Sequence, residues 1–142
     1  MEKQKMNWVV ASFLSMISFA IMILILRKVT ELKLVPEVVN FYFFLFTTIG
    51  FLCFVLLRRA PLTLSAGALP FFILVAVVAV AANFYSITAI AAAPNPGYVR
   101  GIEAFSAAVI TLAALYLFGA EINSLKLVGI GFSVVGVILI SL

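Results

Sequence analysis

The sequence predicts an all-α integral membrane protein with five transmembrane helices. Hydrophobic residues make up 66% of the 142 residues and charged residues only 10%, whereas about a quarter of the residues in a soluble domain are charged. The nine basic residues also lie in short groups between long apolar runs, as is typical of chains that cross a bilayer several times.

Each apolar run is long enough to cross the hydrocarbon core, which takes roughly 20 apolar residues in a helix. Lys5 and Arg27 bracket the first run, and Trp8 lies where interfacial aromatic side chains are enriched. Glu37 and Arg58 bracket the second run. The expected helices cover residues 7–26, 38–57, 69–92, 98–119 and 125–142.

Short connections separate these helices. The Pro-Asn-Pro-Gly run at 94–97 ends the third helix, because neighbouring Pro and Gly residues interrupt helices. The fourth helix is expected to end by Gly119, and Asn123 or Ser124 to cap the fifth. No linker or low-complexity tract intervenes, so residues 1–142 are expected to form a single transmembrane domain.

Enzyme chemistry, metal binding and nucleic-acid binding have little support in the composition. The chain has no histidine and one cysteine, Cys53, so no internal disulfide and no Cys/His zinc cluster can form. Its net charge of +4 comes from dispersed basic residues and not from one basic stripe. We expect no enzyme activity, no cofactor, no metal and no nucleic-acid partner.

The basic residues are divided almost equally between the two sides that five helices define. The side of the N-terminus carries Lys3, Lys5, Arg58, Arg59 and Lys126, and the other side carries Arg27, Lys28, Lys33 and Arg100. An excess of basic residues on the cytoplasmic side normally fixes orientation. A difference of five against four has two interpretations: either it suffices for one orientation, or copies insert both ways up.

The C-terminal part of the chain resembles a known family. A helix that opens with Ile-Glu-Ala-Phe at 102–105 closes with Leu-Phe-Gly-Ala-Glu-Ile-Asn-Ser at 117–124. Leu-Val-Gly-Ile-Gly at 127–131 and Val-Gly-Val-Ile-Leu at 135–139 follow. This pattern resembles the end of an EamA-type domain of the drug/metabolite transporter superfamily. Two residues depart from it, namely Ala120, inserted between the usual Gly-Glu pair, and Ala104, where many members have proline.

The resemblance implies a transporter. Typical members have two five-helix halves in inverted orientation around a central substrate path, and a five-helix chain corresponds to one half. An antiparallel homodimer would complete it, and the even charge balance is what such a pair requires. The implied function is transport of a metabolite, amino acid or amphipathic compound by alternating access, in the plasma membrane of a prokaryote. The alternatives are a half-transporter that needs a different partner chain, and an accessory subunit without a path.

Polar residues inside the apolar helices are the candidates for a substrate path, because such groups should face a cavity or a partner and not lipid. Asn83 and Ser86 share a face of the third helix, which the resemblance places beside the path together with Tyr85. Ser12 and Ser15 form a small polar face on the first helix. The alternatives are an interhelical hydrogen bond for Asn83 and close helix packing for the serines.

Two further groups have both a structural and a functional interpretation. Glu103 and Arg100 are neighbours on one helix face, and form either a gate or coupling site or an interfacial ion pair. Gly129, Ser133 and Gly136 make a small-residue face that lets helices approach closely. This face is expected to be a packing seam, either within the bundle or between two chains.

Overall fold

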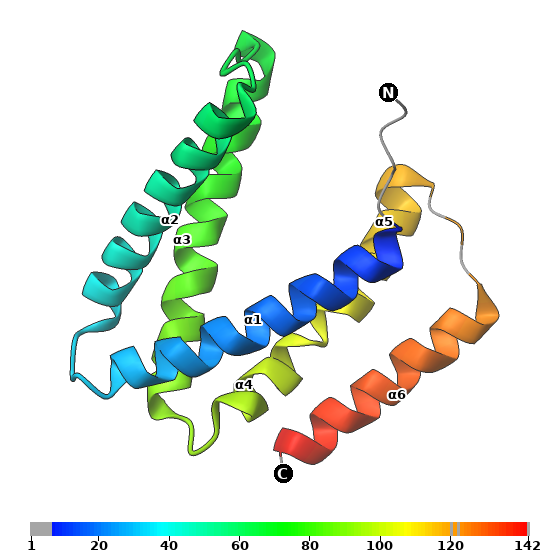
Figure 1. The fold of residues 1–142 in the computed structure, drawn as a ribbon. Helices are drawn as coiled ribbons and strands as arrows, with labels where there is room; N and C mark the ends of the chain where they lie inside the picture. The colour runs from blue at the N-terminus through cyan, green and yellow to red at the C-terminus, as the bar shows by residue number, and fades with distance from the viewer. Residues whose placement is uncertain (1–6, 120, 122, 142) are drawn as a thin grey trace. The chain divides into compact units, whose positions relative to one another are not determined.

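The computed structural model describes residues 7–119, 121 and 123–141, without the side chain of Lys126. All regular elements in this part are helical, which confirms the predicted all-α class. They are α1 (Trp8–Thr30), α2 (Pro36–Arg58), the 3-10 turn η1 (Ala66–Ala68), α3 (Leu69–Ala92), α4 (Pro96–Glu103), α5 (Ser106–Phe118) and α6 (Ser124–Ser141) (Figure 1).

The helices have the length and composition of membrane spans. Four apolar stretches are long enough to cross a bilayer, namely Trp8–Thr30, Pro36–Arg58, Ala66–Ala92 and Pro96–Phe118. Helix α6 has 18 residues, and at 1.5 Å per residue it is about 27 Å long, close to the roughly 30 Å of the hydrocarbon core. Large apolar side chains are exposed along all of these helices, as expected where lipid is the solvent.

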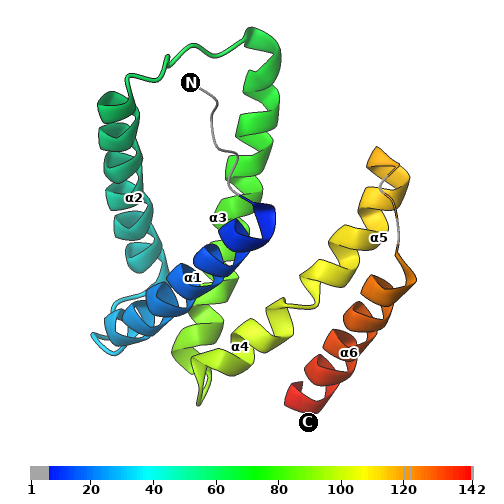
Figure 2. The ribbon, with the colours of Figure 1, turned by 45° about the vertical axis from the view of Figure 1, so that its right-hand side comes forward.

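The chain divides into two compact units, and the boundary lies between Ala92 and Ala93. In the first unit α2 and α3 lie side by side and run in opposite directions, while α1 diverges from them toward its N-terminus (Figures 1 and 2). The buried apolar residues gather where α1 ends, α2 begins and α3 ends; they are Ile23, Leu26, Val39, Ile87 and Ile90. The core of this unit is therefore at one end of its helices.

Helix α1 continues four residues beyond its predicted end. Arg27 and Lys28 lie in its last turn, where cations complement the partial negative charge of the helix C-terminus. The Lys28 ammonium donates a hydrogen bond of 2.8 Å to Glu31 and lowers the pKa of the Glu31 carboxyl. Lys33 follows with a φ of 58°, so the helix ends through a left-handed turn and not at the first charge.

Asparagine side chains cap three of the helices. The Oδ1 atoms of Asn7, Asn95 and Asn123 accept hydrogen bonds of 2.9, 2.8 and 2.9 Å from the backbone N–H two residues on. Each cap satisfies a donor that the first helical turn leaves without a partner. Asn123 was one of the two expected caps, and the cap at Asn95 lies within the predicted helix break.

Replacement of Asn95 by alanine is expected to lower the free energy of unfolding by about 1 kcal/mol, because it removes the cap of α4. Asn95→Asp is the matched control, because aspartate also caps. Denaturant titration followed by circular dichroism measures both. Equal stability of the alanine and aspartate variants would show that this cap contributes nothing.

The second unit contains α4, α5 and α6, and α6 packs against both of the others. The predicted fourth helix, 98–119, corresponds to the span Pro96–Phe118, which is interrupted at Ala104–Phe105. There the Phe105 N–H bonds the Ile102 carbonyl and the Ala107 N–H bonds the Ala104 carbonyl, the i to i+3 pattern of a 3-10 turn. The interruption occurs without the proline that many family members have at this position. Gly119, with a φ of 60°, closes α5 as expected.

Gly101 marks a close approach of α4 to α6. A Cβ atom built at this glycine would lie 2.5 Å from the Ile140 Cδ1 atom. Any larger side chain at Gly101 therefore displaces Ile140 or separates the two helices.

Candidate substrate site

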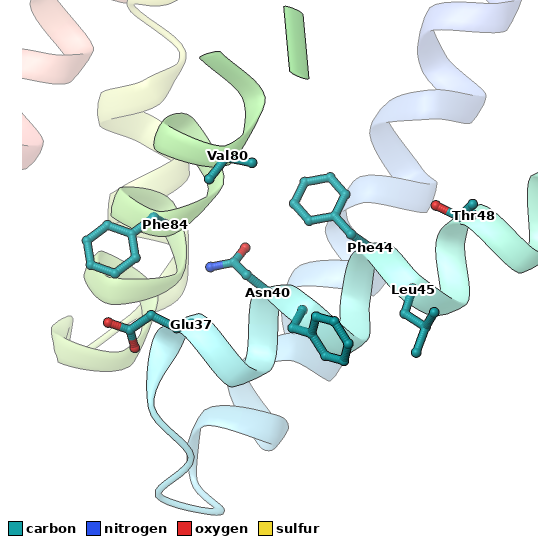
Figure 3. A pocket seen from close by; sticks show the side chains of 8 residues that line it. Glu37, Asn40, Phe44, Leu45, Thr48, Val80 and Phe84 are labelled. Atoms are coloured by element: carbon teal, nitrogen blue, oxygen red, sulfur yellow. The ribbon is translucent and has the colours of Figure 1, made fainter. Parts of the chain in front are cut away.

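A cavity of about 500 Å³ lies between α2 and α3 within the first unit (Figure 3). Its walls are mostly apolar and aromatic, and three polar side chains from α2 interrupt them. The lining residues are Glu37, Asn40, Phe41, Phe44, Leu45, Thr48, Val80 and Phe84. Both the volume and the few convergent polar groups are typical of pockets for small ligands.

Asn40 supplies an unused hydrogen-bond acceptor in this cavity. Its Nδ2 atom donates to the Pro36 carbonyl at 3.0 Å, one turn back in α2. Its Oδ1 atom is buried and has no hydrogen-bond partner in the described part of the chain. A buried acceptor left unpaired costs about 1–3 kcal/mol. The side chain is directed from α2 toward α3 (Figure 3), so a donor in the cavity can remove this cost.

Glu37 places a carboxylate at one end of the same cavity. It lies in the first turn of α2, where the helix dipole favours a negative charge. The ion pairs found among the described residues are Lys28–Glu31 and Arg100–Glu103, and Glu37 is in neither. Figure 3 shows Glu37 at the start of α2, at the end of the row of lining residues that this helix contributes.

Arg27 joins the C-terminal ends of α1 and α3. Its Nη1 atom donates hydrogen bonds to the carbonyl oxygens of Ile90 at 2.5 Å and Ala91 at 3.0 Å. The last four carbonyls of a helix have no partner within the helix, and a guanidinium there also complements the helix dipole. The sequence predicts Arg27 only as a residue at the membrane border, because the partners of its guanidinium are 63 and 64 residues away.

Comparison with known families decides the class of protein. The model of the EamA-like transporter family matches residues 6–142. The chain belongs to this family. The resemblance seen in the sequence is thereby confirmed, and the protein is a multi-pass membrane transporter of the drug/metabolite transporter type. The members of this family are transporters and not enzymes. The searches of curated proteins and of solved structures found no match.

The structure of this EamA-like transporter separates the five predicted path residues. Asn83 and Ser86 are half-buried on one face of α3, whereas Tyr85 is 70% exposed. Asn83 donates to the Ala79 carbonyl of its own helix at 2.9 Å, and no interhelical bond from its amide is found among the described residues. Ser12, which donates to the Trp8 carbonyl, and Ser15 are exposed on α1. None of the five lines the cavity between α2 and α3, and their role in a path stays a prediction.

Ser86 is the predicted path residue for which stability and transport measurements best separate a role in the path from a role in packing. Its Oγ atom is buried and has no partner among the described residues. Ser86→Ala is therefore expected to leave the free energy of unfolding unchanged or to raise it by up to about 1 kcal/mol. If Ser86 belongs to the path, the same variant lowers transport in proteoliposomes. A marked loss of stability would instead assign the hydroxyl to helix packing.

Arg100 and Glu103 form an ion pair on α4, with 2.5 Å between Nη1 and Oε2. Their side chains are 41% and 34% exposed, and pairs of this kind contribute about 0–1 kcal/mol to stability. The pair lies directly before the interruption at Ala104–Phe105. The ion pair is thus present, and both its position at the membrane interface and a role in gating or coupling stay predictions.

The glycines of the predicted small-residue face of α6 have open space beside them within the second unit. A Cβ atom built at Gly129 or Gly136 would meet no described atom within 4 Å, and among the described residues Ser133 donates to the Gly129 carbonyl of its own helix. Close packing of α6 uses Gly101 of α4 instead. Both expected positions for this seam, within the bundle and between two chains, stay predictions.

Proposed function

We propose that this EamA-like protein moves a small organic solute across the plasma membrane of a prokaryote by alternating access, as an inverted homodimer. The solute is a metabolite, an amino acid or an amphipathic compound. Membership of the family supports transport. Five consecutive spans correspond to one half of an inverted-repeat transporter, in which two halves enclose the substrate path.

The nearly equal number of basic residues on the two sides of the membrane supports the inverted arrangement. Five spans put five of the nine lysines and arginines on one side of the membrane and four on the other. Because basic residues near the spans set orientation, a difference of one gives each orientation nearly the same preference. Equal populations of both orientations are what an antiparallel pair needs.

Orientation-locked variants test the proposal. Thr63→Lys with Ser65→Lys changes the balance from five against four to seven against four. Leu32→Lys with Arg58→Ser and Arg59→Ser changes it to three against five. Each variant should insert one way up and lose transport when expressed alone, and co-expression of the two should restore it.

Transport is measured with purified protein in liposomes, on a panel of labelled amino acids, primary amines and amphipathic dyes. The wild type should accumulate at least one of them above protein-free vesicles. Full transport by one locked variant alone would contradict the inverted homodimer and favour a partner chain of fixed orientation. No transport by the wild type would favour an accessory subunit.

A further inference from the structure

We infer that the cavity between α2 and α3 binds an amphipathic solute whose head is a hydrogen-bond-donating cation, such as a primary ammonium. The inference deepens the proposed function and rests on it for the role of binding in transport, but binding itself is measured separately. Three features of the cavity support it: a carboxylate and a buried acceptor that have no partner among the described residues, and the aromatic walls around them.

The head of the solute is defined by Glu37 and Asn40. These residues are three apart in α2, so their side chains are neighbours on one helix face. An ammonium held there donates one hydrogen bond to the free Asn40 Oδ1 atom and lies close to the Glu37 carboxylate. A neutral hydroxyl satisfies Asn40 alone, and an anionic head is repelled by Glu37. The pair of acceptors therefore selects a cationic donor over both.

The body of the solute is defined by the rest of the wall. Phe41, Phe44 and Leu45 of α2 and Val80 and Phe84 of α3 line the cavity. Apolar and aromatic surface of this kind favours a hydrocarbon or aromatic body, because binding removes that body from water. Aromatic rings beside an ammonium add a cation–π attraction. A small inorganic cation gains nothing from this wall, so the fitting ligand is an organic amine.

Two probes with the same body separate charge from hydrophobicity. Binding of 2-(2-naphthyl)ethylamine and of the neutral 2-(2-naphthyl)ethanol is measured by calorimetry on the full chain in phosphatidylcholine nanodiscs. The amine is expected to bind about fivefold more tightly. Glu37→Gln should weaken binding of the amine, and so reduce this preference, and leave the affinity for the alcohol unchanged. The matched control is Glu31→Gln, which removes a carboxylate outside the cavity and should alter neither affinity.

The acceptor at Asn40 is tested with two variants. Asn40→Leu should weaken both probes, and Asn40→Asp, which keeps the size and adds charge, should bind the amine more tightly than the wild type. Thermal unfolding of each variant shows whether it is folded. If Asn40→Leu does not fold, the affinity of Asn40→Asp for the amine is the test.

Equal affinity of wild type for the two probes, or an amine affinity unchanged by Glu37→Gln, would overturn the inference. The cavity would then be an apolar crevice that lipid or any apolar solute fills. These outcomes are distinct from failure of the proposed function. Amine binding that depends on Glu37 in a protein that transports nothing supports the inference and contradicts only the transport proposal.

Discussion

Replacement of Arg27 by methionine is expected to lower the free energy of unfolding by about 2–3 kcal/mol. The change removes two hydrogen bonds from a charged donor, and the Ile90 and Ala91 carbonyls lose the guanidinium as their partner. Methionine keeps most of the apolar stem, so the change reports on the guanidinium. Arg27→Lys keeps the charge and one donor group, and should recover part of the loss.

Lys28→Met is the matched control for this prediction. Lys28 is the next residue in α1, and it pairs at the surface with Glu31, with side-chain exposures of 79% and 50%. Loss of such a pair costs about 0–1 kcal/mol. Unfolding in mixed micelles of a mild detergent and dodecyl sulfate, followed by circular dichroism, compares the variants. A loss at Arg27 no larger than that at Lys28 would contradict the stabilising contact between α1 and α3.

Replacement of Gly101 by leucine is the second change with a large expected effect. A Cβ atom at this position already lies 2.5 Å from the Ile140 Cδ1 atom, so a leucine must displace Ile140 or force α4 and α6 apart. Overpacking of this kind costs about 1–3 kcal/mol. Gly101→Ala should cost much less, because the end of the Ile140 side chain can rotate away.

A double-mutant cycle assigns this cost to the contact. Ile140→Ala in the Gly101→Leu background should recover part of the stability, and the interaction energy should exceed 0.5 kcal/mol, which is about the limit for independent sites. Gly129→Leu is the control, because the space beside Gly129 is open, and its effect should stay within about 0.5 kcal/mol. Equal losses at Gly101 and Gly129 would show that both act through the helix backbone and not through packing.

The sequence predicted well those features that depend on local chemistry. Uncharged runs of span length identified the membrane helices, and the predicted third helix at 69–92 coincides with α3. Pro-Asn-Pro-Gly at 94–97 and Gly119 marked real helix ends. The predicted end of α1 at residue 26 is too early, because charges such as Arg27 and Lys28 usually mark the end of a span, whereas cations in the last turn also stabilise a helix.

Features that depend on contacts between distant residues could not be predicted in this way. The partners of Arg27 lie in α3, and no spacing rule connects them. The interruption at Ala104–Phe105 has no proline or glycine to mark it. Asn40 and Glu37 looked like ordinary residues of the start of a helix, and the cavity beside them is formed only when α3 packs against α2. By contrast, two of the predicted path residues, Asn83 and Ser12, bond within their own helices.

The most direct test of the inverted homodimer is the orientation of the chain in its membrane. In a Cys53→Ala background, one cysteine is placed at Leu32, which is 67% exposed before α2, or at Thr63, which is exposed after α2. Intact cells are labelled with an impermeant thiol reagent before and after permeabilisation. Because α2 separates the two positions, a nearly balanced charge distribution predicts labelling of about half of the protein from outside at each. Complete labelling at one position with none at the other would contradict the inverted homodimer.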